Sequence, residues 1–372
     1  MRLRPSRQTT LSLLAALAVA GVAGLATTAM AQPAVPRTTV INATDVDGDA
    51  LPHDWERNGY DANGDGIVDV DLPAMGASPD QKDLFVEVDH MAGFLGPIKA
   101  FDRAVEVYAN APVSNPNGST GIRLHVDLGP AGGTKYNLGG GNEVPYAASL
   151  DTSQVFATKA THQTAARAAV FHYFLYMDRY NNGCGGYAFG IPGDLAVVAM
   201  SPVCTNPTEN TWTGVFIHEF GHLLGLHHGG QDATNFKPNY LSVMNYAFSN
   251  RGVLRSDGSS PYFGYQESAL PPLNETSLSE PRGLGTPSAD EWRTIYECPS
   301  GTQTTSGPAG QPIDWNCDGD TTDTAAQVDL NNDGQLTQLN SYADWYALKF
   351  GGGAVGDPVG TAPRAIQRPG AP

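Results

Sequence analysis

The sequence predicts an α+β protein in which a twisted mixed sheet supports one helix with the reactive residues, followed by an irregular C-terminal subdomain. Three observations lead to this fold class. Between residues 82 and 200, segments of alternating apolar and polar residues are separated by segments with helical spacing. A histidine-rich stretch at 217–230 has the apolar residues of a buried helix. The 43 glycines and 27 prolines among 372 residues favour many turns and long irregular connections.

The net negative charge of the chain bears on which classes of molecule it can bind. Its 38 acidic residues against 21 basic ones give a formal net charge of −17. A chain this acidic is repelled by a phosphate backbone, so we expect no nucleic-acid partner. At 372 residues the chain is long enough for one large domain or two smaller ones with a sizeable core. We expect it to be a monomer.

The N-terminus has the pattern of a secretory signal peptide over residues 1–31. Three arginines within residues 1–7 precede an apolar stretch at 11–25, and an A-x-A cleavage site at 29–31 precedes Gln32. The alternative, an uncleaved membrane anchor, is disfavoured because the stretch is rich in alanine and glycine. No other segment of the sequence is long and apolar enough to span a bilayer. We therefore expect a secreted, extracellular protein with no membrane association after cleavage.

The four cysteines form an even number in an exported chain, which favours two disulfide bonds. Sequence proximity favours Cys184 with Cys204 and Cys298 with Cys317, although four cysteines permit three pairings. No two cysteines have the C-x-x-C spacing. A cysteine-based zinc site and a thiol nucleophile are therefore disfavoured.

Two acidic runs within residues 32–80 have the pattern of calcium-binding loops. Oxygen-bearing side chains at alternate positions, with a glycine at the bend, are the ligands that calcium prefers. Neither run is a complete EF-hand, because the glycine of the first is at position 4 and a leucine ends the second. The first run has Asp45, Asp47, Asp49 and Glu56 at positions 1, 3, 5 and 12, and the second has Asp61, Asn63 and Asp65 at positions 1, 3 and 5. Both resemble the calcium-binding repeats of thrombospondin type 3 and dockerin modules; the alternative is a solvated acidic linker.

A similar pair of loops occurs near the C-terminus. Position 12 of these loops is occupied by Ala325 and Asn340, which lack a bidentate carboxylate. We therefore expect weaker calcium binding here, or ligands borrowed from elsewhere in the fold. The ligand positions are Asp314, Asn316 and Asp318 before Gly319, and Asp329, Asn331 and Asp333 before Gly334.

The segment 81–350 alternates strands and helices in its first half. Residues 165–180 are ambiguous, with helical spacing at first and a strand from Val170. Regular structure thins out from about Gly229, where a C-terminal subdomain begins, and residues 351–372 are expected to form a flexible tail. The remaining expected elements are strands at 82–91, 121–129 and 193–200, helices at 97–113 and through the histidine stretch, the latter capped by Thr211 or Thr213, and a short helix at 340–349.

The histidine stretch contains the pattern H-E-x-x-H-x-x-G-x-x-H, from His218 to His228. Residues four apart lie on one face of a helix, so His218 and His222 can hold the same metal ion. Gly225 can take a left-handed conformation that ends the helix and brings His228 to the ion. Three imidazoles leave one position of a tetrahedral Zn²⁺ ion open for water, which is typical of a catalytic site.

Glu219 lies beside these ligands in the sequence, and we expect it to take the proton of the zinc-bound water. Two alternatives concern the histidines. All of them could be buried core residues, which the fixed offsets of Gly225 and His228 disfavour. His227 could also replace its neighbour His228 as the third ligand.

The stretch LSVMNY follows the motif and contains Met244 and Tyr246. Together with the zinc motif it resembles the metzincin zinc peptidases, in particular pappalysin-like and other secreted bacterial members. The resemblance implies an α/β metzincin-like catalytic domain with Met244 in a tight turn beneath the metal. It also implies that Tyr246 reaches the zinc or the transition-state oxygen, as the matching tyrosine does in the astacin, serralysin and pappalysin branches. A gluzincin is disfavoured because the nearest downstream glutamate, Glu267, lies outside any expected helix.

These features predict a secreted zinc metalloendopeptidase that hydrolyses peptide bonds in proteins or peptides, with Ca²⁺ as a structural ion. The substrate would lie extended along an edge strand, for which 193–200 is the candidate. One alternative is a calcium-binding extracellular surface or adhesion protein with a catalytically idle metzincin fold. Glu219 counts against it, because a structural zinc needs no base beside an open position. A zinc hydrolase with a substrate other than a peptide is the third reading.

Overall fold

The computed structural model describes residues 44–204 and 206–359. The expected signal peptide at 1–31 and the start of the acidic segment lie outside the described residues, as does the expected tail from residue 360 onward. No helix in the described ranges is long and apolar enough to cross a membrane.

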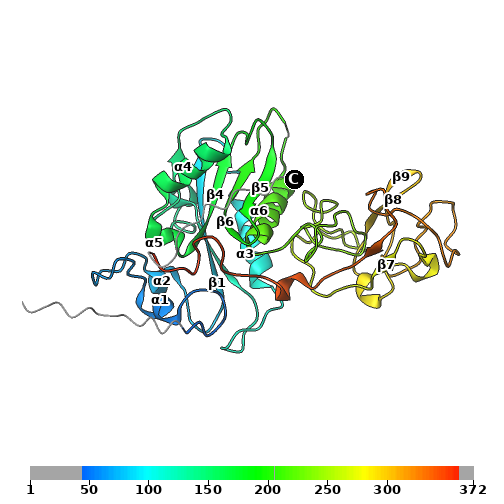
Figure 1. The fold of residues 1–372 in the computed structure, drawn as a ribbon, viewed down its shortest axis with the longest axis horizontal. Helices are drawn as coiled ribbons and strands as arrows, with labels where there is room; N and C mark the ends of the chain where they lie inside the picture. The colour runs from blue at the N-terminus through cyan, green and yellow to red at the C-terminus, as the bar shows by residue number, and fades with distance from the viewer. Residues whose placement is uncertain (1–43, 205, 360–372) are drawn as a thin grey trace, which may run out of the picture. The chain divides into compact units, whose positions relative to one another are not determined.

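A six-stranded sheet forms the centre of the fold (Figure 1). The strand order is β2-β1-β4-β6-β5, and the short β3 pairs with the end of β1. All pairings are parallel except that of β5 with β6, so the sheet is mixed, as predicted, and mostly parallel, which is compatible with the α+β class. The strands are β1 (Asp83–Met91), β2 (Arg123–Asp127), β3 (Glu143–Val144), β4 (Phe171–Met177), β5 (Gly185–Gly190) and β6 (Gly193–Ala199).

The helices cover both faces of this sheet. On one face, α3 and α6 share a core with alternate residues of the central strands, such as Val86, Phe174 and Val198. On the other face, Val155 of α4 packs with the intervening residues, such as Tyr173 and Val197. This alternation follows from the two-residue period of a strand. The helices are α1 (His53–Asn58), α2 (Leu72–Met75), α3 (Ile98–Ala109), α4 (Thr152–His162), α5 (Ala165–Ala168) and α6 (Glu209–Leu223).

The strands and helices expected from periodicity are confirmed at 83–91, 98–109, 123–127 and 193–199. The ambiguous residues 165–180 form α5 and then β4. Several elements had no clear signal in the sequence, among them α4 and the glycine-rich β5 with the sequence GGYAFG.

The expectation that 193–200 is the edge strand is wrong. This segment, β6, lies between β4 and β5, and the edge is β5. The cause is that β5 pairs with β6 as an antiparallel strand and occupies its outer edge. The periodicity of the sequence gave no sign of this pairing. Any substrate that extends the sheet on this side pairs with β5.

The expected helix cap is also wrong. The N-cap of α6 is Thr208, whose side chain accepts a hydrogen bond from the Thr211 backbone N–H, while the Thr211 hydroxyl accepts one from the Thr208 backbone N–H. Thr213 lies inside the helix, where its hydroxyl donates to Glu209 O. The reciprocal pair satisfies two backbone donors that the first turn leaves without helical partners.

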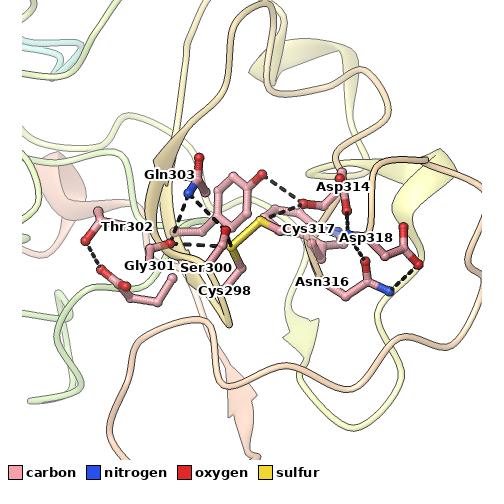
Figure 2. The surroundings of a disulfide bond; sticks show 12 residues. Cys298, Ser300, Gly301, Thr302, Gln303, Asp314, Asn316, Cys317 and Asp318 are labelled. Atoms are coloured by element: carbon pink, nitrogen blue, oxygen red, sulfur yellow. Dashed lines mark hydrogen bonds between the residues drawn. A yellow bond between two sulfur atoms is a disulfide. The ribbon is translucent and has the colours of Figure 1, made fainter.

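The C-terminal part of the chain is irregular, as expected, and has its own core around Phe248, Leu284 and the fully buried Trp315. The disulfide Cys298–Cys317 joins its hairpin to the loop that contains Asp314 and Asp318 (Figure 2). The other disulfide is Cys184–Cys204, so both bonds have the pairing that sequence proximity favours. The short strands here are β7 (Leu273–Asn274), β8 (Ile295–Cys298), β9 (Gly301–Thr304) and β10 (Gln338–Leu339).

The short helix expected at 340–349 is reduced to a single 3₁₀ turn at Asp344–Tyr346. Asp344 is the reason, because it is bonded to another loop at both backbone and side chain. Its N–H donates to Gln266 O, and its carboxylate accepts from the Tyr240 hydroxyl at 2.7 Å and from Gln266 N at 3.2 Å.

Residues 351–359, which the sequence places in the tail, contact the body of the protein. Gly356 N donates to Ala169 O, Ala354 N donates to the Asp194 carboxylate, and Val359 N donates to the Tyr60 hydroxyl.

Asp344→Asn should make the stability of the protein less dependent on pH. Burial raises the pKa of Asp344 to about 7, from an ordinary value of 3.8. The folded state therefore holds this proton more tightly than the unfolded chain, and the linked stability is complete below about pH 4 and is lost as the pH rises through 7. As the pH rises through this window, the free energy of unfolding of the wild type should fall relative to that of the variant by up to about 1.4 kcal/mol per pH unit. Urea unfolding at pH 4 to 8 measures this difference, and a constant difference would contradict it.

Candidate metal centre

The histidine motif lies on α6, a helix whose residues from Trp212 to Leu223 are all buried. Phe216 packs against Phe101 of α3 and Phe174 of β4, with ring centroids 5.4 and 4.9 Å apart. Phe220 packs against Tyr108 in the same layer. Because this apolar side is held by the sheet, the histidines on the other side of the helix have a fixed position.

Gly225 ends the helix in the way that the sequence predicts. Its φ is +90°, in the left-handed region that favours glycine. Gly225 N donates to His222 O and Leu226 N donates to Gly221 O, the two hydrogen bonds of a Schellman motif. The chain turns away from the helix axis at this point and returns toward the histidines.

The structure brings His218, His222 and His228 together. Each offers one ring nitrogen, and these nitrogens lie within 4.8 Å of one another. The Nε2 atoms of His222 and His228 are 3.1 Å apart. Two of the rings are oriented by main-chain carbonyls, since His218 Nδ1 is 2.8 Å from Val243 O and His222 Nδ1 is 2.7 Å from Leu226 O. A proton on each Nδ1 leaves Nε2 as an electron-pair donor toward the shared point.

The electrostatic environment keeps these rings neutral. Burial lowers the pKa of His218 to about 4, lowers that of His222 well below its ordinary value, and lowers that of His228. A neutral imidazole is the form that binds a metal ion, so no proton has to leave these ligands near neutral pH. Three imidazole nitrogens suit zinc and other borderline transition metals better than calcium or magnesium. The donor set thus fits a transition-metal ion.

A short loop decides between the two neighbouring histidines. His227 N donates to Gly230 O and Gly230 N donates to His227 O, which closes a tight turn over 227–230. Lys237 fixes the turn by donating from Nζ to Gly229 O and to the Asp232 carboxylate. In this geometry His228 joins the cluster, and His227 is not a member of it.

Met244 lies in a tight turn against α6. Asn245 N donates to Ser242 O, which closes the turn, and Met244 is fully buried. The turn packs so closely on Gly221 that a Cβ there would lie 2.3 Å from the methionine sulfur. Val243 of the same turn accepts a hydrogen bond from the His218 ring, so the turn orients one residue of the cluster.

Tyr246 stands at the open side of the cluster. Its ring centroid is 4.2 Å from that of His228 and 5.4 Å from that of His218, yet 48% of the residue is exposed. Asn235 accepts a hydrogen bond from Tyr246 N at 3.0 Å. Partial burial, with a smaller contribution from Glu219, raises the pKa of its hydroxyl, so the group is a proton donor over the physiological range.

Glu219 is 5% exposed and lies under the edge strand β5. Burial raises the pKa of its carboxyl to about 8. Gly186 of β5 makes room for it, because a Cβ at this position would lie 2.1 Å from Glu219 Oε1. The contact between Gly186 and Glu219 was missed in the sequence, where a glycine in a weak strand pattern gives no sign of its partner.

The first acidic loop also brings its predicted ligands together. Asp45, Asp47 and Asp49 form one group of converging carboxylates, and Asp49 and Glu56 form a second with Asp83 of β1. Burial raises the pKa values of Asp47, Asp49 and Glu56 to about 6, 8 and 9, respectively. Asp83 was missed because it lies 27 positions after Glu56, in a strand pattern unrelated to the loop.

The other three acidic loops fold as compact turns. Asp61, Asp314 and Asp329 each accept hydrogen bonds from the backbone of their own loop, including the N–H of the glycine at position 6, which is Gly66, Gly319 or Gly334. No three His, Asp or Glu ligand atoms converge in these loops within the described residues. Their third positions are asparagines, and Asn63, Asn316 and Asn331 each donate to the aspartate two positions on, namely Asp65, Asp318 and Asp333.

Two buried glutamates close the C-terminal loops. Glu280 accepts from Trp315 N and Asp323 N, and Glu275 accepts from Leu330 N and Thr337 N. These carboxylates come from another segment of the chain, and they accept hydrogen bonds from backbone N–H groups.

Comparison with known proteins gives no match: no protein-family model matches the chain, and neither a curated protein nor a solved structure is significantly similar to it.

His228→Ala should weaken metal binding far more than His227→Ala. Of these two neighbours, only His228 contributes a ring nitrogen to the cluster, so its loss leaves the imidazoles of His218 and His222. We expect zinc affinity to fall by at least about 100-fold, beyond the 10- to 100-fold that the loss of a residue supporting a ligand costs. Competition against a chromogenic chelator measures the affinity. Equal losses in the two variants would show that the third ligand is misassigned.

Proposed function

We propose that the protein is a secreted zinc metalloendopeptidase with a metzincin-like catalytic domain. The observation that carries the proposal is the convergence of three neutral imidazoles beside a buried glutamate and an exposed-edge strand. The resemblance of the motif from His218 to Tyr246 to metzincins supports the same conclusion. Two disulfides and the signal-peptide pattern support secretion.

His218, His222 and His228 would hold the zinc ion, which when bound polarises a substrate carbonyl and makes a coordinated water more acidic. Glu219 is the general base that accepts the water proton and returns it to the leaving amine. Its raised pKa suits this task, because a base near the working pH can both take and release a proton. Its burial beneath β5 excludes competing solvent.

Tyr246 supplies a second function at the open side of the site. Its hydroxyl remains protonated, and its ring is held against His218 and His228. In this position it donates a hydrogen bond to the oxygen that gains negative charge during the reaction. Comparable oxyanion donors contribute about 2 to 4 kcal/mol to catalysis.

The edge strand β5 favours a peptide over other substrates of a zinc hydrolase. Within the described residues, β5 pairs as a strand with β6 alone, and its outer edge can hydrogen-bond an extended chain. Gly186 places this edge directly above Glu219. A purely structural or adhesive role would require neither a buried base nor an open strand beside the histidines.

Calcium is our proposal for the acidic groups of the first loop, where only carboxylate oxygens converge. The ion would be structural, because this loop and the histidine cluster are built from different elements.

Glu219→Gln should keep zinc and lose nearly all turnover. Glutamine fits the same space but cannot take a proton, and a general base contributes about 10²- to 10⁴-fold to rate. Digestion of a peptide library, read by mass spectrometry, measures turnover, and zinc content is measured in parallel. Glu209→Gln, at the exposed start of the same helix, is the control and should retain activity. A fully active Glu219→Gln protein would refute the role of this residue.

Gly186→Ala should reduce turnover without removing zinc. The new methyl group collides with Glu219 and must displace either the carboxylate or β5. A shift of this kind, on the order of 1 Å, costs about 100-fold in rate. Gly183→Ala is the matched control, because its Cβ would meet nothing closer than 3.4 Å. If both variants have wild-type activity, the contact between β5 and Glu219 does not position the base.

A further inference from the structure

The N-terminal segment buries more negative charge than it neutralises. Asp47, Asp49, Glu56 and Asp83 are each between 1% and 5% exposed. In the described part of the chain, two permanent cations lie near them: Lys82, which donates to Asp47 O and Ser114 O, and Arg123, which pairs with Asp83 at 2.8 Å. Four buried carboxylates facing two such cations require further positive charge or protons.

Two of these side chains have no hydrogen-bond partner among the residues that the structure describes. Both carboxylate oxygens of Asp47 and both of Glu56 are buried and unpaired. Leaving a buried charged oxygen unpaired is strongly unfavourable, and Glu56 faces the group formed by Asp49 and Asp83. These orphaned oxygens indicate a ligand, and they are independent of the pattern by which the loop was recognised.

Asp83 belongs to the sheet and not to the loop. It is the first residue of β1, and its carboxylate accepts from Ser78 N at 2.8 Å and contacts His125 Nε2 at 2.6 Å on β2. Its own backbone N–H donates to Asp49 at 2.7 Å. The residue thus joins the acidic loop to two strands of the central sheet.

We propose that Asp83 is a ligand of the same divalent cation as Asp49 and Glu56, and that this ion clamps the N-terminal segment to the central sheet. The proposal rests on the calcium assignment in the proposed function and extends it from a loop ligand set to a connection between parts of the fold. It does not depend on zinc or on peptidase activity.

The donor set selects calcium over other ions. The converging atoms are all carboxylate oxygens. Zinc and copper prefer nitrogen and sulfur ligands, so this set does not favour them. Calcium accepts six to eight oxygens in irregular geometry, whereas magnesium requires a nearly ideal octahedron and retains several waters. A ligand set drawn from a loop, a helix and a strand fits the irregular geometry of calcium and does not fit the octahedron of magnesium.

The clamp would stabilise a specific interface. Leu51, Trp55 and Tyr60 pack in one cluster with Phe85 of β1 and Phe171 of β4. Val359 near the end of the described chain joins the same cluster. Release of the ion would leave four buried acids to repel one another directly above this contact.

The test uses mature protein stripped of metal in chelator-free buffer and then titrated with CaCl₂. Bound calcium is counted by equilibrium dialysis, and the melting temperature is followed in parallel. At about 100 times the dissociation constant, calcium should raise the melting temperature of the wild type by about 5 °C. Glu56→Gln should bind one ion fewer and lose that part of the increase. Asp54→Asn, at an exposed position of the same helix as Glu56, should change neither value.

The variant Asp83→Asn tests whether Asp83 is a ligand of the ion. We expect calcium affinity at this site to fall by at least about tenfold, since the affinity of such sites follows the number of charged ligands. Arg123→Gln is the matched control: it breaks the ion pair with Asp83 but should keep the ion count of the wild type. Unchanged calcium affinity in Asp83→Asn would overturn the clamp while leaving the loop site intact. If the wild type binds no calcium that Glu56→Gln lacks, both the clamp and the calcium assignment are wrong, and the peptidase proposal is unaffected.

Discussion

The geometry of the histidine cluster depends on hydrogen bonds between imidazole rings and main-chain carbonyls. His218 is held by Val243 O, from the turn that contains Met244, and His222 by Leu226 O, just beyond the helix end. Each bond fixes a ring and its tautomer at the same time. The helix, the chain reversal at Gly225 and the methionine turn therefore have to fold together before three nitrogens can meet.

This dependence explains which parts of the site could be predicted from sequence. His218, His222, Gly225 and His228 are spaced by local helix geometry and by one glycine conformation, so their positions in the chain suffice. Gly186 and Asp83 could not be found in this way. Each matters through a contact across the fold, with Glu219 in one case and with the acidic loop in the other, and such contacts leave no periodic signal.

The fold shows the same division. Strands β1, β4 and β6 are largely buried and β2 alternates between half-buried polar and buried apolar residues, and periodicity identified these four strands. The strand β5 consists largely of glycine and small residues, so its place at the edge is fixed by its pairing with β6 and not by its composition. The error about the edge strand follows directly, because strand order is a long-range property. The 3₁₀ turn at Asp344 is a similar case, since the bonds to Tyr240 and Gln266 override a local helical preference.

Burial has opposite effects on the metal-binding forms of the two candidate metal groups. In the histidine cluster, burial lowers the pKa of each ring, so the apolar surroundings themselves favour the neutral form that binds a metal. In the acidic cluster, burial opposes the charged form of Asp49 and Glu56, so the protein alone disfavours the state that binds a cation. The histidine cluster is therefore preorganised without an ion, and it can retain an open position for chemistry. The acidic cluster gains most from an ion that fills it, which is the behaviour of a structural site. The contrast follows from the sign of the charge on each ligand type, and it supports the proposed division into a reactive site on α6 and a structural site in the N-terminal segment.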